Sequence, residues 1–129
     1  MASKFATVIN CMDGRVQEPV NNWMKERTGA EYIDVITEAG PDRILASTAT
    51  ASRLILERIL ISRDKHDSKD LAVVAHHDCA GNPVTREQHL ADLKRAARIL
   101  STWNLEMKLL LLWVNSDWKV EMIEEINPD

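Results

Sequence analysis

Residues 5–15 read FATVINCMDGR, in which an apolar, β-branched run ends at Cys11 and a polar turn follows. Residues 71–79 read LAVVAHHDC and follow the same order, with an apolar run that ends in two histidines and the second cysteine. Both runs have the composition of strands that are covered on both faces. Parallel sheets bind ligands beyond the carboxyl ends of their strands, where the strand order reverses. We therefore expect the chemistry of this chain to lie after these two strands.

Strand-like and helix-like patterns alternate along the whole chain. The predicted strands cover residues 5–10, 32–37, 71–75 and 108–115. The predicted helices cover residues 16–27, residues 42–62 and a third stretch in which Leu90, Leu93, Ala97 and Leu100 follow a capping box of Thr85 and Gln88. The remaining assignments are a charged surface loop at residues 63–69 and an antiparallel edge strand at residues 118–123.

This alternation predicts an α/β fold with a mostly parallel sheet flanked by helices and joined by right-handed crossovers. The 129 residues suffice for a single domain, residues 1–129, whose core needs no disulfide. The helix predicted over residues 42–62 carries an apolar stripe wider than one sheet face requires. The stripe includes Leu45, Ile55, Leu56, Ile59, Leu60 and Ile61. We therefore expect a homodimer or a larger assembly.

The composition excludes several classes of partner. Hydrophobic residues make up 45% of the chain, charged residues 28%, and the formal net charge is -4. This mild acidity, without a basic run, offers no surface for nucleic acid or an anionic membrane. The first apolar run lacks a signal-peptide cleavage site, and no stretch approaches the ~18 apolar residues of a spanning helix. We predict a cytoplasmic protein in which Cys11 and Cys79 stay reduced.

Cys11, His76 and Cys79 are the candidates for a metal site. His76 and Cys79 stand three residues apart in a turn, and zinc prefers nitrogen and sulfur ligands at ~2.0–2.3 Å. If the two strands are neighbours, Cys11 supplies a third ligand and one position stays open, as in catalytic zinc sites. The alternative is that both cysteines are small buried hydrophobic residues, with His76 and His77 as ordinary polar residues. The residues alone leave both interpretations open.

Asp13 and Arg15 stand two residues apart directly after Cys11. In an extended segment such residues point the same way. Beside a metal, the guanidinium would fix the carboxylate through a charge-assisted bond and keep it ionised. The alternative is a surface ion pair of little energetic worth.

The order of these motifs resembles the β-class carbonic anhydrases over about residues 5–123. The resemblance rests on C-x-D-x-R after the first strand, DVITEAG at the second strand, and H-x-x-C after the third. It implies that Cys11, His76 and Cys79 bind zinc and that Asp13 and Arg15 form the catalytic pair, which organises the metal-bound water. It also implies the strand order 2-1-3-4, which puts the first and third strands side by side.

The function implied by the resemblance is reversible hydration of carbon dioxide to bicarbonate by zinc-bound hydroxide, the reaction of a carbonate dehydratase lyase. Two alternatives use the same residues: a hydrolase of carbonyl sulphide or carbon disulphide, and a zinc-binding relative without hydratase activity. The fourth zinc ligand is water or Asp13, since family members show both arrangements. The proton shuttle candidates are His66, His77 and His89, and none is favoured.

The chain departs from the family pattern in three places. Ala80 stands where a glycine usually follows the motif cysteine, and Thr37-Glu38 stand where Arg-Asn usually precedes Ala-Gly. The sequence also lacks the N-terminal helices that often clasp the partner subunit. These departures leave the metal ligands intact and affect the pocket wall and the dimer contact.

Overall fold

A five-stranded sheet forms the centre of the molecule. The computed structural model describes residues 3–47 and 49–128. The strands are β1 (Phe5–Cys11), β2 (Tyr32–Glu38), β3 (Asp70–His76), β4 (Lys108–Val114) and β5 (Val120–Ile126). Their order is β2-β1-β3-β4-β5, with the first four strands parallel and β5 antiparallel to β4. The predicted fold class and strand order are confirmed.

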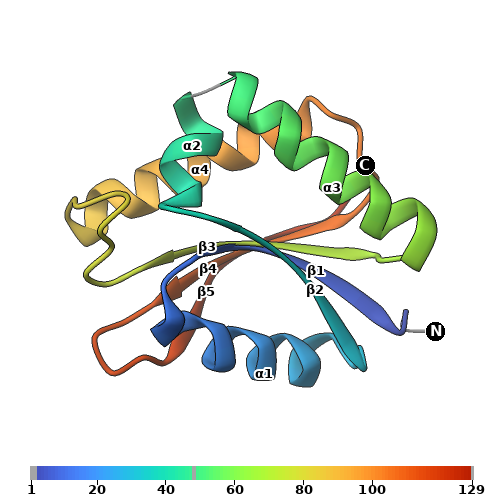
Figure 1. Ribbon diagram of the computed structural model, residues 1–129, viewed down its shortest axis with the longest axis horizontal. Helices are drawn as coiled ribbons and strands as arrows, with labels where there is room; N and C mark the ends of the chain where they lie inside the picture. Colours follow the sequence, from blue (N-terminus) through green and yellow to red (C-terminus); the bar gives the residue numbers. More distant parts are fainter. Residues whose placement is uncertain (1–2, 48, 129) are drawn as a thin grey trace.

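Helices cover both faces of the sheet. A 3-10 helix, η1 (Gly14–Val16), leads into α1 (Gln17–Thr28), which lies alone on one face. The other face carries α2 (Pro41–Ser47), α3 (Ala49–His66) and α4 (Arg86–Ser101) (Figure 1). Each layer has its own apolar cluster, because side chains alternate between the two faces of a strand. Within the described part of the chain, no helix has the length and apolar character to cross a bilayer.

The helix predicted over residues 42–62 is wrong as a single element, because the structure contains two helices there. α2 ends at Ser47 and α3 begins at Ala49, and Thr48 between them lies outside the described residues. Serine and threonine are weak helix formers because their side chains bond nearby backbone groups. Ser47 illustrates this, since its hydroxyl donates to the carbonyl of Arg43 at 2.6 Å.

The surface loop predicted at residues 63–69 is wrong in its first half, where α3 continues as far as His66. Charge alone suggested a loop at this point. However, Arg63, Lys65 and His66 lie in the last turn of α3, where positive charge is favoured by the helix dipole. The helix therefore ends later than the sequence indicated.

The edge strand predicted at residues 118–123 is displaced, since β5 covers Val120–Ile126. Trp118 belongs to the preceding turn, in which its N–H donates to the carbonyl of Asn115 at 2.9 Å.

The capping box before α4 is only half formed. Thr85 accepts from the Gln88 N–H, as predicted, but the Gln88 side chain donates to Asp92 instead of returning to the Thr85 backbone.

The strand order brings the two quoted stretches to one edge of the sheet. β1 pairs with β3 in parallel, with Thr7 opposite Leu71 and Ile9 opposite Val73. Cys11 and His76 are the last residues of these strands. The loops after β1, β3 and β4 gather at this carboxyl edge, on the left in Figure 1.

Candidate metal centre

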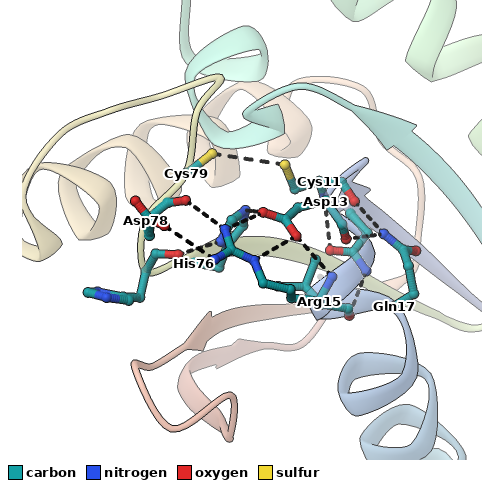
Figure 2. Close-up of polar contacts among 10 residues, drawn as sticks. Cys11, Asp13, Arg15, Gln17, His76, Asp78 and Cys79 are labelled. Carbon is teal, nitrogen blue, oxygen red and sulfur yellow. Dashed lines mark hydrogen bonds and ion pairs between the residues drawn. The ribbon is translucent and has the colours of Figure 1, made fainter.

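Cys11, His76 and Cys79 form a buried cluster at the carboxyl edge of the sheet. Cys11 ends β1, His76 ends β3, and Cys79 lies in the loop before α4. Their potential ligand atoms all lie within 4.8 Å of one another. The two sulfur atoms point toward each other at 3.9 Å (Figure 2). The exposed fractions of the three residues are 3%, 0% and 4%, so all three candidate ligands are buried.

The chemistry of this cluster fits a zinc ion. Two sulfur ligands at ~2.3 Å from a tetrahedral zinc lie about 3.8 Å apart, close to the observed 3.9 Å. His76 Nδ1 lies 2.7 Å from the carbonyl of His77 and must donate to it. Nε2 therefore carries the lone pair, and it is buried without a hydrogen-bond partner among the described residues. Metal-ligating histidines almost always donate their other ring N–H in this way, so His76 has the orientation of a ligand.

The two thiols divide their protons unequally. The pKa of Cys11 lies well below its ordinary value, chiefly because the Cys79 thiol donates a hydrogen bond to its sulfur, although burial opposes the shift. The pKa of Cys79 is raised because of this hydrogen bond to Cys11 and because of burial. The pair therefore favours one thiolate and one thiol in the absence of a cation. A bound cation would displace the second proton.

Gly40 and Gly81 let two loops meet around the sulfur atoms. A Cβ on Gly40, whose φ is +68°, would lie 2.7 Å from the carbonyl carbon of Gly81. A Cβ on Gly81 would lie 2.3 Å from the carbonyl carbon of Ala39, so only glycine allows this approach. Backbone groups on both sides of this contact favour the thiolate forms: Gly40 lowers the pKa of Cys11, and Asn82 and Gly81 oppose the rise in the pKa of Cys79.

Asp13 and Arg15 form a forked ion pair beside the cluster. Arg15 Nη2 donates to Asp13 Oδ2 at 2.7 Å, and Arg15 Nε donates to Oδ1 at 3.1 Å. The backbone N–H of Arg15 also donates to Oδ1, at 2.9 Å, as Asp13 caps η1. These hydrogen bonds lower the pKa of Asp13 to about 2, with the Arg15 side chain as the main cause. Asp13 Oδ2 lies 4.0 Å from His76 Nε2, so an ionised carboxylate borders the candidate metal position.

The comparisons with known proteins give the family. A family model described as "Putative carbonic anhydrase" matches residues 1–124. The chain belongs to this family. A search of curated protein sequences found no significant match.

Solved structures of carbonic anhydrases share the fold of this family member. The carbonic anhydrase from Glaciozyma antarctica aligns over 95% of this chain and 83% of its own, with 16% identity and a TM-score of 0.62. The enzyme from Streptococcus mutans aligns over 95% and 82%, with 16% identity and a TM-score of 0.63. One of two tetrameric beta-carbonic anhydrases from Sordaria macrospora aligns over 95% and 81%, with 12% identity and a TM-score of 0.55. At these identities the likeness establishes the fold alone.

Two of the departures from the carbonic anhydrase pattern have a structural explanation. Ala80 is exposed, so its methyl group needs no space within the loop. The close approach that glycine permits falls one residue later, at Gly81. Glu38 forms a salt bridge with Arg58 of α3 at 3.5 Å instead of presenting an amide. Neither departure removes a residue of the candidate metal centre.

The three histidines considered as proton shuttles lie in different surroundings. His89 is 1% exposed and bonds Asp42 at 2.7 Å inside the core. His66 is exposed but lies at the end of α3, where it bonds Asp34 and stacks on Phe5 at the start of β1. His77 is exposed and adjoins His76 at the carboxyl edge. Of the three, His77 alone combines exposure with a place beside the cluster.

Sequence reasoning missed three residues that support the Asp13–Arg15 pair. Arg15 Nη1 donates to Asp78 Oδ2 at 3.2 Å, and Nη2 donates to the Asp78 carbonyl at 3.2 Å (Figure 2). The Arg15 guanidinium lies over the ring of Trp118, 4.4 Å from its centroid. Gln17 donates to the carbonyls of Cys11 and Asp13 at 2.7 and 2.8 Å. The position of Asp78 inside the H-x-x-C motif was the one available signal, because the other contacts depend on how the loops fold.

Proposed function

We propose that this protein is a zinc-dependent carbonic anhydrase that reversibly hydrates carbon dioxide to bicarbonate. The main observation in support of the proposal is that an ionised carboxylate, Asp13, lies beside a buried Cys–His–Cys cluster. Three ligands leave one tetrahedral position for a substrate or water, as catalytic zinc sites do. Family membership supports the same reaction.

In this proposal Cys11, His76 and Cys79 hold the zinc. When bound, zinc supplies a Lewis acid that makes water a stronger acid and a better nucleophile near neutral pH. Asp13 accepts a hydrogen bond from the attacking water and turns a lone pair of that water toward carbon dioxide. An acceptor must be unprotonated for this task, and the lowered pKa of Asp13 keeps it so.

Arg15 keeps Asp13 in its accepting position. Its guanidinium engages both carboxylate oxygens, and the backbone N–H of the same residue engages Oδ1 as well. A carboxylate held on this side cannot turn to occupy the open metal position. Arg15 therefore protects the place at which water enters.

The proton released by hydration needs a route to solvent. We propose His77 for this step, because it is exposed beside the cluster and an imidazole can both accept and release a proton. The contact between its carbonyl and His76 Nδ1 fixes the backbone at that point.

We also propose a homodimer or a larger assembly that uses the β2 edge. Several exposed apolar side chains lie on β2 and α3: Tyr32 at 55%, Val35 at 37%, Leu54 at 51% and Ile61 at 60%. Arg58, between the last two along α3, reaches Glu38 on β2 at 3.5 Å, so this face of the helix borders the strand. Within the described residues β2 pairs with β1 alone. The Sordaria macrospora enzymes are tetrameric.

Sedimentation at micromolar concentration tests the assembly. Val35→Lys should dissociate it, since a lysine on an edge strand opposes pairing with another chain. Met122→Lys is the matched control, because Met122 is also 37% exposed and lies on β5 at the opposite edge. A wild-type monomer would contradict the proposal.

We propose the cytoplasm as the working compartment. Both candidate ligand cysteines must remain unoxidised to hold zinc, and a reducing compartment keeps them so. Both are free cysteines in the structure.

The test of the proposed reaction combines zinc analysis with a stopped-flow hydration assay. We expect one zinc per chain and a carbon dioxide hydration rate that disappears when a chelator removes the metal and returns with added zinc. A fully zinc-loaded protein without turnover at any pH would contradict the proposal and indicate a zinc-binding relative. Turnover of carbonyl sulphide or carbon disulphide without that of carbon dioxide would identify a hydrolase instead.

A further inference from the structure

Arg15 is held by three loops at the carboxyl edge of the sheet. Asp13 comes from the loop after β1, Asp78 from the loop after β3, and Trp118 from the turn between β4 and β5. The two aspartates bind the rim of the guanidinium, and the indole covers its face at 4.4 Å from the ring centroid. Half of the Arg15 side chain, 47%, is nevertheless exposed. An arginine this exposed keeps one orientation only if its neighbours restrict it.

The backbone of Trp118 is in a conformation that a tryptophan rarely adopts. Its φ is +59°, in the left-handed region that favours glycine and asparagine. The other non-glycine residues of this kind in the described chain are polar: Asp67, Asp78, Asn104 and Glu106. The turn is fixed by hydrogen bonds between Asn115 and Lys119 and from the Trp118 N–H to the Asn115 carbonyl. Glycine at position 118 would form this turn with less strain.

Strained backbone often marks a functional position, where the surrounding structure tolerates it. Both non-glycine residues near the site with a left-handed backbone, Asp78 and Trp118, contact Arg15. The indole also lies near the exposed His77, with 6.3 Å between ring centroids. A bulky side chain therefore occupies a glycine-like position at the point where it covers Arg15.

We propose that Trp118 is a positioning residue that keeps the Arg15 guanidinium on Asp13. The proposal rests on the proposed function in so far as Asp13 and Arg15 act in hydration. The indole restricts rotation of Arg15 toward solvent and attracts its charge through the ring face. Without the ring, Arg15 leaves Asp13 part of the time, and Asp13 is then free to turn toward the metal. The competing explanation is that Trp118 only fills space beside the sheet, since it packs against the apolar cluster under α1.

Three substitutions separate these explanations. Trp118→Phe keeps an aromatic face, whereas Trp118→Ala and Trp118→Gly both remove it. The last two differ in backbone strain, because glycine suits φ +59° and alanine does not. We expect Trp118→Gly to melt at a higher temperature than Trp118→Ala, with equal losses of hydration activity of about two- to fivefold, the range of a cation–π contact at an exposed site. Trp118→Phe should retain most of the activity.

A second readout does not depend on turnover. Arg15 Nε–H donates to Asp13 Oδ1 at 3.1 Å, so its hydrogen exchange by NMR in the zinc-loaded protein reports on this bond. We expect exchange to be about two- to fivefold faster in Trp118→Ala and Trp118→Gly than in the wild type and Trp118→Phe. Trp103→Ala is the control, since Trp103 packs in the apolar cluster on the opposite face of the sheet. It should leave the Arg15 signal unchanged.

The outcomes distinguish failure of the inference from failure of the proposed function. If activity follows melting temperature, so that Trp118→Gly is more active than Trp118→Ala, or if Arg15 exchange is unchanged in both, Trp118 is not a positioning residue. If the wild type does not hydrate carbon dioxide at all, the proposed function fails. The exchange measurement then still decides whether Trp118 holds Arg15 on Asp13.

Discussion

The two halves of the candidate site are built in different ways. Cys11, His76 and Cys79 are at most 4% exposed, and two of them end neighbouring strands in the middle of the sheet. Asp13 and Arg15 have side chains that are 19% and 47% exposed, and they lie in loops held by side-chain contacts. Two of the three candidate ligands are therefore fixed by the sheet and the third by a buried loop, whereas the Asp13–Arg15 pair is fixed by a small set of polar and aromatic neighbours.

Because of this difference, metal retention and turnover should respond to different substitutions. A change in the buried cluster should release the metal and abolish activity together. A change in the exposed pair should reduce activity while the metal stays bound. Each prediction below tests one side of this division.

The largest effect is expected for Cys79→Ser. Loss of one of three protein ligands should weaken zinc affinity by more than about 100-fold, since even residues that only orient ligands are worth ~10–100-fold. Hydration activity should fall to background at equimolar zinc. Asp78→Asn is the control, because it changes the residue next to Cys79 without removing a candidate ligand, and it should keep the metal. Full zinc retention by Cys79→Ser in a competition titration would remove Cys79 from the site.

The next effect is expected for Asp13→Asn. The amide is close to the same size but cannot serve as an anionic acceptor, so activity should fall by ~10²-fold or more, as for other positioned catalytic groups. Zinc content should remain at one per chain. Stopped-flow hydration measures the activity, and metal analysis of the same sample measures the zinc content. An active Asp13→Asn protein would show that Asp13 is dispensable.

Arg15→Ala should also lose activity, but for another reason. The freed Asp13 carboxylate, already 4.0 Å from His76 Nε2, should turn onto the zinc and displace the water. Zinc should stay bound or bind more tightly. Arg15→Lys is the control, because it keeps the charge but not the fork that engages both oxygens. Unchanged activity and an unchanged zinc shell in Arg15→Ala would reduce the pair to an ordinary surface contact.

The smallest expected effect is one on stability, at the glycine contact behind the sulfur atoms. Gly81→Ala would place a Cβ 2.3 Å from the Ala39 carbonyl carbon, so the loops must separate. The free energy of unfolding should fall by ~1–3 kcal/mol, as for other overpacked sites. Ala80→Gly, at the neighbouring exposed position, should change stability far less. Equal denaturation midpoints for the two variants would show that the loop contact is not tight.

The sequence predicted most of the fold because burial controls it. The apolar runs that end at Cys11 and His76 have no polar alternation, which indicated central parallel strands. The wrong boundaries lie where local chemistry competes with periodicity. Ser47 bonds its own helix backbone, and the cations up to His66 suit a helix end as well as a loop.

The residues of the candidate site that belong to the two sequence motifs could be predicted, and those outside the motifs could not. Cys11 and His76 end neighbouring strands, and the loop after β3 brings the Cys79 sulfur within 4.8 Å of their ligand atoms. Trp118 could not be predicted, because an αL tryptophan contradicts the turn preference that sequence reasoning relies on. The catalytic roles of Asp13 and Arg15 stay predictions until activity is measured.

Zinc-edge X-ray absorption of the purified protein, loaded with one equivalent of zinc, tests the central claim most directly. We expect a first shell of two sulfur atoms at ~2.3 Å and two nitrogen or oxygen atoms at ~2.0–2.1 Å, from Cys11, Cys79, His76 and one exchangeable ligand. A shell without sulfur would mean that zinc binds elsewhere on the protein. That result would contradict the assignment of this cluster as the metal centre.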